Sequence, residues 1–404
     1  MRDKICIVCN HALAFEPLLT LNHMPASAQD IPDQEDLATD HGITLNLHQC
    51  ENCGLVQFDC DPVPYYKDVI RSGGFTTTMV NLRRQQYQHF IDAYHLEGKK
   101  LIEPGCGQGE FLLVLSEFPV TACGIEHRES LVELGKEKGL RIWKQFAGQG
   151  EILKSPDGSI SGPYDGFVSF NFLEHQPDPV GMLRCIAENL TEDGVGLVTV
   201  PSLEYILKYN GYYELIRDHI AYYTFDTLRF AAEKAGFEVL EEEMVNRDTL
   251  SVIIRKKKSQ KTDSQQSNRI ESGEETAYGL DLSGLKESQK AIGGEIKRLV
   301  DELKAQGKRL AVWGASHQGF TLAATTIVGE FASYIIDSAP FKQGKYAPAS
   351  HLPIVAPDYF MKDPVDAILI VAPGYTEEIK RSIMEKFGRN VKILALKSNH
   401  LERI

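Results

Sequence analysis

A glycine-rich turn between an apolar strand and a helix is the feature of this sequence that most constrains its fold. The stretch KKLIEPGCGQGEFLL contains a predicted strand, Lys100–Glu103, and a helix that begins at about Glu110. Gly105, Gly107 and Gly109 have no Cβ to keep a ligand away, and glycine adopts positive φ readily. Such a turn at the carboxyl end of a strand is typical of nucleotide-binding sheets.

The acid before the glycines indicates the kind of ligand. A carboxylate at Glu103 repels a pyrophosphate but attracts an ammonium group, so the pattern E-x-G-x-G-x-G favours S-adenosylmethionine (SAM) over a dinucleotide. Glu126 follows the next predicted strand, Val120–Ile125, about twenty residues after the loop, where an acid can accept both ribose hydroxyls. The alternative interpretation is a glycine-rich loop that binds no ligand.

Strands and helices alternate from residue 99 to about 255, which predicts a mostly parallel sheet closed by two strands in Phe237–Arg255. The strand Tyr164–Phe170 ends in Asn171, and we expect the polar groups that follow it at the crevice beside the donor. Phe146 and Ala147 are candidates for contacting the adenine. The predicted fold class is α/β.

The cysteines are concentrated near the N-terminus, where five of the eight fall within the first sixty residues. In a long intracellular chain this clustering points to metal before disulfides. Two C-x-x-C turns can place four thiolates, Cys6, Cys9, Cys50 and Cys53, on one tetrahedral ion, which predicts a closed structural zinc site. The alternative is two unrelated turns or a redox pair. The residues between the turns are expected to form a loop.

A dense group of titratable and aromatic residues lies in the stretch ELIRDHIAYYT, residues 214–224. A histidine near neutral pKa can remove a proton, and an adjacent acid can orient it, so His219 and Asp218 are candidate catalytic residues. Tyr222 follows three residues later. The alternative interpretation is that His219 is a satisfied helix residue and the tyrosines are core.

The length of 404 residues predicts two or three domains, and a formal net charge of −13 argues against a nucleic acid polymer as partner. The sequence has neither a long apolar run nor an N-terminal signal pattern, so we expect a cytoplasmic protein without a membrane partner, as a monomer or homodimer. The polar segment Lys256–Thr276 is expected to be a linker or a solvated edge.

A second alternating unit occupies residues 308–404, after a long helix predicted over Leu285–Gln306. A strand leads into the turn Gly314–Gly319, a later strand ends in Asp337, and Val391–Ala395 is expected to be the last strand. This order copies a nucleotide-binding unit, but only two glycines lie in the turn. Binding of a substrate or nucleotide sugar, a degenerate structural domain and a second cofactor site all stay open.

Taken together, these motifs resemble those of the sugar C-methyltransferases that act on nucleotide-linked keto-deoxysugars. The resemblance covers nearly the whole chain and rests on the two C-x-x-C pairs, the E-x-G-x-G-x-G loop, the D-H-x-x-Y-Y-T stretch, and Asp337 with the K-Q-G-K-Y sequence that follows it. It implies a zinc-binding domain (1–65), a class I methyltransferase domain with a Rossmann-like sheet (66–256), and a linker, long helix and Rossmann-like α/β domain (257–404).

The resemblance also implies roles for residues. The zinc ligands fall on the four cysteines, the donor loop on Glu103 and its three glycines, the ribose acid on Glu126, and the base at the substrate carbon on His219. Two departures are visible, since family members often have tyrosines where this chain has Ile216 and Arg71. The expected reaction is SAM-dependent C-methylation; the alternatives are O- or N-methylation of a related polar metabolite, or a non-catalytic nucleotide-binding protein.

Overall fold

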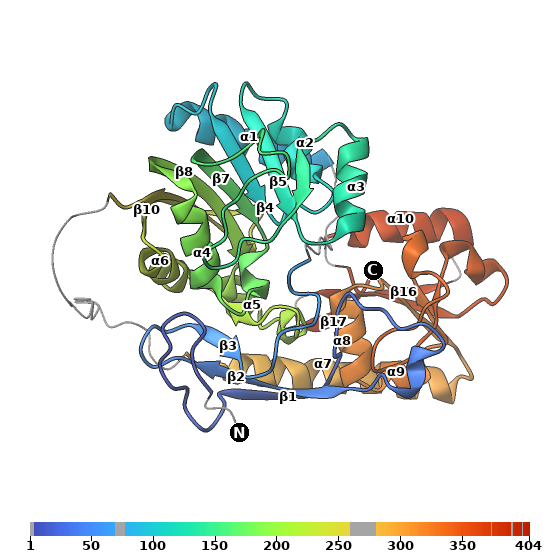
Figure 1. Cartoon of the computed structure of the whole chain (residues 1–404). Helices are drawn as coiled ribbons and strands as arrows, with labels where there is room; N and C mark the ends of the chain where they lie inside the picture. The colour runs from blue at the N-terminus through green and yellow to red at the C-terminus, as the bar shows by residue number, and fades with distance from the viewer. Residues whose placement is uncertain (1–3, 69–76, 259–279, 373, 389–390, 398) are drawn as a thin grey trace.

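The computed structural model describes residues 4–68, 77–258, 280–372, 374–388, 391–397 and 399–404. Within these ranges the chain forms sheets of four, seven and six strands, and Figure 1 shows their arrangement. Among the helices of the described part, none has the length and apolar character needed to cross a bilayer.

The central sheet has seven strands in the order β10-β11-β8-β7-β4-β5-β6. They are β4 (Lys100–Pro104), β5 (Thr121–Glu126), β6 (Ile142–Lys144), β7 (Tyr164–Phe170), β8 (Leu190–Pro201), β10 (Phe237–Val245) and β11 (Thr249–Lys256). Strands β4 to β8 run parallel, and β10 and β11 close one edge with antiparallel pairing. The predicted sheet with two closing strands is therefore confirmed.

Helices cover both faces of this sheet because successive strand residues point to opposite sides. They are α1 (Thr77–Ala93), α2 (Glu110–Leu115), α3 (Glu129–Glu137), α4 (Pro179–Glu188) and α6 (Phe225–Lys234). The short helix α5 (Leu203–Tyr209) instead packs into the core that the N-terminal sheet shares with α7. Leu101 and Val168 belong to a buried cluster with residues of α1, α2 and α3. Their neighbours Ile102 and Phe167 belong to another, with residues of α4, α6 and the N-terminal cysteines. The cysteine-bearing segment thus packs against one face of the central sheet's domain.

The N-terminal sheet is antiparallel and has the order β1-β2-β3-β9. Its strands are β1 (Leu19–Met24), β2 (Ile43–Gln49), β3 (Val56–Phe58) and β9 (Ala221–Tyr222). The segment between the cysteine turns was expected to be a loop, and this was wrong over β1 and β2. Its alternate leucines, such as Leu19, Leu21, Leu45 and Leu47, are buried in a shared core, which stabilises strands there.

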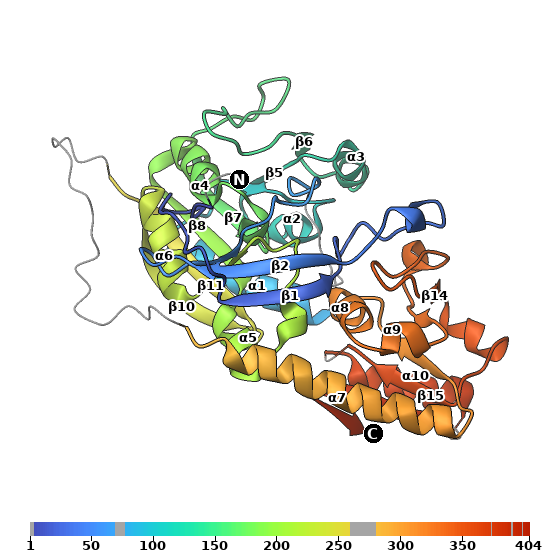
Figure 2. The ribbon, with the colours of Figure 1, turned by 90° about the horizontal axis from the view of Figure 1, so that it is seen from below.

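The C-terminal unit is a six-stranded sheet in the order β14-β13-β12-β15-β16-β17. Its elements are α7 (Ser283–Ala305), β12 (Leu310–Trp313), α8 (His317–Thr325), α9 (Val328–Phe331), β13 (Ile335–Ile336), β14 (Ile354–Val355), β15 (Ala367–Ile370), α10 (Thr376–Phe387), β16 (Lys392–Lys397) and β17 (His400–Arg403). Val391–Ala395 is not the last strand, because β17 follows β16 and pairs with it antiparallel. Figure 2 shows α7 as a long helix that extends from near α5 along this unit. Short 3₁₀ helices are η1 (Asp36–Ala38), η2 (Leu173–His175), η3 (Tyr212–Glu214), η4 (Pro340–Lys342) and η5 (Pro357–Met361).

The N-terminal unit also contacts the C-terminal unit directly. Asp33 forms an ion pair with Lys345 (Nζ–Oδ2 2.8 Å), and Oδ2 of Asp40 lies 2.9 Å from Nε2 of His351. The Tyr346 N–H donates to the carbonyl of Pro32 at 2.9 Å. The acidic segment between the cysteine turns therefore contacts residues more than three hundred positions away in sequence.

Candidate active site

The glycine loop is held in shape by the neighbouring strand. Amides of Gly105 and Cys106 donate to the carbonyl of Ile125 at 2.9 and 3.1 Å. Gly105, Gly107 and Gly109 all have positive φ, at 67°, 59° and 80°. At Gly109, which caps α2, a Cβ would lie only 2.3 Å from Cδ1 of Leu140. Side chains at these positions would therefore be strained, and the loop keeps its backbone open to a ligand.

Two acids lie at the carboxyl ends of adjacent parallel strands. Glu103 in β4 is fully buried, and in the register of the sheet it pairs with Gly124 of β5, two residues before Glu126. The Glu126 carboxylate accepts hydrogen bonds from the amides of Gly107 (3.0 Å) and Arg128 (2.9 Å). Burial raises the pKa of Glu126. The second acid is thus tied to the glycine loop itself.

The candidate adenine and crevice residues lie after the next strands. Phe146 is half-buried, and its ring makes edge-to-face contacts with Tyr66 (centroids 6.3 Å apart) and Phe172 (6.5 Å). Asn171 follows β7 with a positive φ of 48° and accepts a hydrogen bond from the hydroxyl of Thr199 at 3.0 Å. The loop, the two strand-end acids and these groups fit SAM, since they offer a carboxylate for its ammonium group and an aromatic ring for its base.

The candidate base is carried by a segment that the N-terminal unit holds from one side. The Phe58 N–H donates to the carbonyl of Ile220 at 3.0 Å, and β3 pairs with β9 immediately afterwards. Asp218 does not turn its carboxylate to His219. Instead Oδ2 accepts from the Ala28 amide (2.8 Å) and Oδ1 from the Tyr65 hydroxyl (2.6 Å).

Tyr222 closes the same segment from within. Its buried hydroxyl accepts from the Ile216 amide at 2.8 Å and donates to the Ile216 carbonyl at 3.1 Å. Ile216 stands where members of the resembled family often have a tyrosine. In this chain its backbone N–H and carbonyl hold the Tyr222 hydroxyl. The second such position, Arg71, lies outside the described residues.

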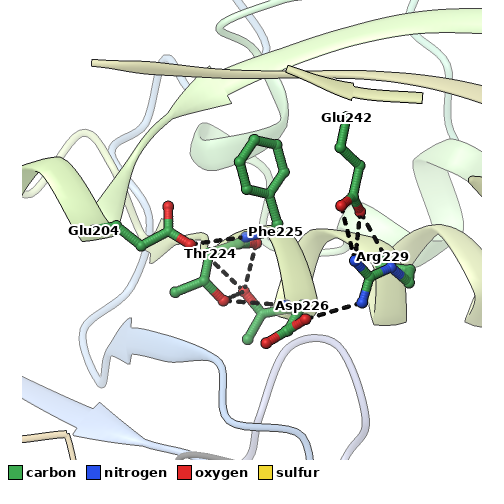
Figure 3. A network of polar contacts seen from close by, with 7 residues as sticks. Glu204, Thr224, Phe225, Asp226, Arg229 and Glu242 are labelled. Carbon is green, nitrogen blue, oxygen red and sulfur yellow. Dashed lines mark hydrogen bonds and ion pairs between the residues drawn. The ribbon is translucent and has the colours of Figure 1, made fainter. Parts of the chain in front are cut away.

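The end of this segment is fixed at the start of α6 (Figure 3). Thr224 caps the helix by exchanging hydrogen bonds with Thr227, and the Phe225 amide donates to Glu204 of α5 at 3.3 Å. Further along α6, Arg229 makes a paired contact with Glu242 of β10 at 2.8 Å. Residues 218–224 are therefore anchored at both ends, and capping contacts of this kind typically stabilise a helix by about 1 kcal/mol.

His219 is half-buried and lies against a second histidine from the end of β7. The rings of His219 and His175 are edge-to-face with centroids 4.8 Å apart. Nδ1 of His175 lies 2.7 Å from the carbonyl of Asp218, so Nδ1 carries the proton. Burial lowers the pKa of both histidines, that of His219 well below 6.5. Both rings are therefore uncharged near neutral pH.

Glu174, next to His175, completes this group. Its side chain is 1% exposed, and burial raises its pKa to about 8. The sequence indicated polar groups after β7 but gave His175 and Glu174 no role. Their proximity to His219 comes from a contact across more than forty residues, which local spacing does not reveal.

The four N-terminal cysteines meet as expected for a metal knuckle. Cys6 and Cys53 have sulfurs 3.5 Å apart, Cys9 and Cys50 have sulfurs 3.4 Å apart, and the four sulfurs lie within 4.8 Å of one another. A tetrahedral ion with Zn–S bonds of ~2.3 Å holds its sulfurs ~3.8 Å apart. The donor set and spacing therefore fit a zinc ion.

The C-terminal unit repeats the geometry of the donor loop. Asp337, after β13, accepts from the amides of Ala315 (2.9 Å) and Ala339 (2.8 Å). Lys342 donates to the Ala315 carbonyl at 2.8 Å and lies 3.4 Å from the Asp337 carboxylate. At the start of α8, His317 lies 2.9 Å from Glu214 of the methyltransferase unit. This contact joins the second nucleotide-type turn to the end of η3, five residues before His219.

Comparisons with known proteins agree with this architecture. Residues 79–242 match the family model described as a methyltransferase domain, and residues 248–395 match the model described as a C-methyltransferase C-terminal domain. The C-methyltransferase NovU of Streptomyces niveus is 23% identical over 401 residues, which cover 95% of this chain and 94% of that protein.

Other similarities cover a smaller share of the chain. The ubiquinone biosynthesis O-methyltransferase of Escherichia coli O127:H6 is 26% identical over 125 residues, or 28% of this chain and 52% of that protein. Among solved structures, magnesium protoporphyrin IX methyltransferase (ChlM) from Synechocystis PCC 6803, with bound SAH, covers 46% of this chain and 90% of its own at 16% identity and a TM-score of 0.35.

The two family matches and the strand order define a SAM-dependent methyltransferase of the class I, Rossmann-like fold. The second match is to a C-methyltransferase C-terminal domain, and NovU is similar along nearly the whole chain, so the chain is similar to SAM-dependent C-methyltransferases in both its central and its C-terminal unit.

Proposed function

We propose that this enzyme methylates a carbon next to the ketone of a nucleotide-linked keto-deoxysugar, with His219 as the base. The observation that carries the proposal is the placement of His219, half-buried and uncharged, on an anchored segment beside His175 of η2. Relatedness to a C-methyltransferase along almost the whole chain supports transfer to carbon.

The donor is assigned to the edge of the central sheet. Glu103 is proposed to hold the ammonium group of SAM, Glu126 its ribose, and Phe146 and Asn171 the adenine and the crevice wall, above the backbone of Gly105, Gly107 and Gly109. Bound there, SAM supplies an electrophilic methyl group. The protein residues contribute orientation and a water-poor crevice, which can account for much of the acceleration.

The acid–base chemistry is assigned to the segment after η3. His219 takes the proton from the substrate carbon, and a ring that is neutral near pH 7 has the lone pair this step needs. Asp218 and Tyr222 are proposed to act by holding this segment, because their polar atoms bind Ala28, Tyr65 and the Ile216 backbone.

We further propose that the four cysteines hold one structural zinc ion and that the chain divides into units of 1–65, 66–256 and 257–404. Metal analysis of freshly purified protein should give about one zinc ion per chain, and a strong chelator should unfold the N-terminal sheet. Less than about half an equivalent of zinc would contradict the zinc assignment.

Donor binding is the first test. SAM titrated calorimetrically into the wild-type protein is expected to bind, and Glu103→Ala to bind at least about tenfold more weakly because the ammonium group loses its carboxylate. Asp337→Asn, in the second loop, is the matched control and should bind as the wild type does. A wild-type protein that does not bind SAM would end the proposal.

Proton transfer is tested without methyl transfer. A nucleoside-diphosphate 4-keto-6-deoxyhexose incubated with enzyme in D₂O should gain deuterium at the carbon acid, and His219→Asn should lose this exchange. Exchange that persists in His219→Asn removes His219 as the base. With SAM present, mass spectrometry of the product separates C-methylation from the alternative of O- or N-methylation.

A further inference from the structure

Glu174, His175 and His219 form a compact group whose polar atoms are only partly used. Both carboxylate oxygens of Glu174 are buried and lack a hydrogen-bond partner among the described residues. Oε1 of Glu174 lies 3.8 Å from Nε2 of His175, and one ligand atom from each of the three residues lies within 4.8 Å of the others. Two buried carboxyl oxygens without a hydrogen-bond partner require an explanation, and a bound ion, which would replace the carboxyl proton, is one of the few available.

The orientation of His175 adds an independent observation. Its Nδ1 donates to the Asp218 carbonyl at 2.7 Å, so the lone pair of Nε2 is directed to the side where Glu174 lies. Metal-binding histidines almost always have this arrangement, in which the second ring nitrogen donates to a carbonyl or carboxylate. Asp218 is in turn fixed by Ala28 and Tyr65, which makes the carbonyl a rigid partner.

We propose that Glu174, His175 and His219 bind a divalent first-row transition metal ion such as zinc. Two imidazole nitrogens and one carboxylate oxygen are a common ligand set for such ions, which leaves further positions for solvent. Bonds of ~2.1 Å allow ligand atoms to lie up to ~4.2 Å apart, so the 3.8 Å pair already fits. The half-buried His219 closes the remaining distance by a small side-chain movement and gives the ion its entry path.

This site differs from the cysteine knuckle in chemistry and in consequence. Four thiolates leave no open position, whereas the second site has one oxygen and two nitrogen ligands, of which that of His219 is only half-buried. If His219 is the base, which is the proposed function, its lone pair cannot hold the ion and accept a proton together. The metal ion is then a reversible inhibitor that competes with proton abstraction.

Metal binding is measured on the full-length protein with its cysteine site loaded. After dialysis to about one zinc ion per chain, Co²⁺ is added and its visible absorption followed, and Zn²⁺ is titrated by calorimetry. We expect one further equivalent of each ion, with the weak visible bands of nitrogen and oxygen ligation. Cobalt bound by four thiolates instead gives intense sulfur charge-transfer bands, so the two sites are distinguished.

Variants identify the ligands. Glu174→Gln and His175→Asn should each weaken Zn²⁺ binding at least about tenfold, while the cysteine-bound zinc is retained. His89→Asn is the matched control, because His89 and Glu241 form an exposed pair at 2.7 Å on the surface. Unchanged affinity in Glu174→Gln and His175→Asn, or absence of a second equivalent in the wild type, overturns the proposal.

Two measurements separate this inference from the proposed reaction and from misfolding. In the wild-type protein, Zn²⁺ should protect His219 from modification by diethyl pyrocarbonate, mapped by peptide mass spectrometry, and unchanged modification counts against the site. Zn²⁺ should also suppress the deuterium exchange described above. Binding without suppression would retain the metal site and contradict His219 as the base.

Discussion

The donor loop and the turn of the C-terminal unit use the same backbone device with different charges. In both, the carboxylate at the end of the second strand accepts one hydrogen bond from a backbone amide of the preceding turn and one from the amide two residues further on. The donors are Gly107 and Arg128 for Glu126. They are Ala315 and Ala339 for Asp337. The difference is that Asp337 has a lysine, Lys342, 3.4 Å away.

The glycines differ between the two turns as well. In the donor loop all three glycines have positive φ, whereas in the second turn only Gly314 does, and Gly319 in α8 allows close packing, since a Cβ there would lie 2.0 Å from the Gly314 carbonyl. A glycine turn followed by a strand-end acid therefore indicates only the backbone arrangement at the carboxyl edge of a Rossmann-like sheet. The charge around the acid decides what that edge can bind.

The comparison is tested most strongly at the two acids. Glu126→Ala should weaken SAM binding by about 10- to 100-fold, equivalent to about 1.4–2.7 kcal/mol, because the ribose loses a charged acceptor. Asp337→Ala should change SAM affinity less than about twofold. Calorimetric titration of both variants measures the difference, and equal losses would show that the two edges are not functionally distinct.

Glycine substitutions should separate packing from backbone strain. Gly319→Ala should lower the free energy of unfolding by about 3 kcal/mol or more, because its Cβ meets backbone that cannot move freely. Gly344→Ala, at a φ of +85° with open space around it, should cost only about 1 kcal/mol. Urea unfolding monitored by circular dichroism gives both values, and the reverse order would contradict the packing argument.

The lysine is expected to have a smaller effect. Lys342→Met removes the cation beside Asp337 and a hydrogen bond to Ala315, so we expect a loss of about 1 kcal/mol of stability and no change in SAM binding. Thermal unfolding with and without SAM checks both. A loss of SAM affinity of similar size, about 1 kcal/mol, would indicate that the second turn is energetically coupled to the donor loop.

The smallest expected effect is on the pH dependence of stability. Burial raises the pKa of Glu126, so the native protein holds this proton to higher pH than the unfolded chain does. The free energy of unfolding therefore falls as pH rises from the unfolded-state value of ~4.3 to the raised native value. Glu126→Gln removes this contribution. Unfolding curves at several pH values should therefore show that the free energy of unfolding falls less steeply with rising pH in the variant than in the wild type.

Local patterns predicted the donor loop and the central sheet, because the glycines, Glu103 and the strand periodicity lie within one continuous stretch. They failed where the partner is remote. Asp218 was expected to orient His219, yet its oxygens bind Ala28 and Tyr65, which lie 190 and 153 residues away in sequence. The role of its carboxylate in positioning the segment is therefore a property of the assembled fold.

The same limit applies at the chain's ends. The segment between the cysteine turns carries enough acids and prolines to read as a loop, but Leu21 and Leu45 contribute to a core shared with α7 and the C-terminal unit. Likewise β17 is stabilised by pairing with β16, which a short polar C-terminal sequence does not indicate. In both cases burial against distant elements outweighs local composition.

The pairing of β3 with β9 has a consequence for what counts as the minimal enzyme. Part of the scaffold next to His219 is supplied by β3, which lies before the methyltransferase domain and precedes His219 itself by more than a hundred positions in sequence. A shortened protein that begins at α1 would keep the cofactor fold yet lose the brace for its reactive loop. If the proposed zinc ion is needed to fold the N-terminal sheet, its removal would also release the segment that carries His219.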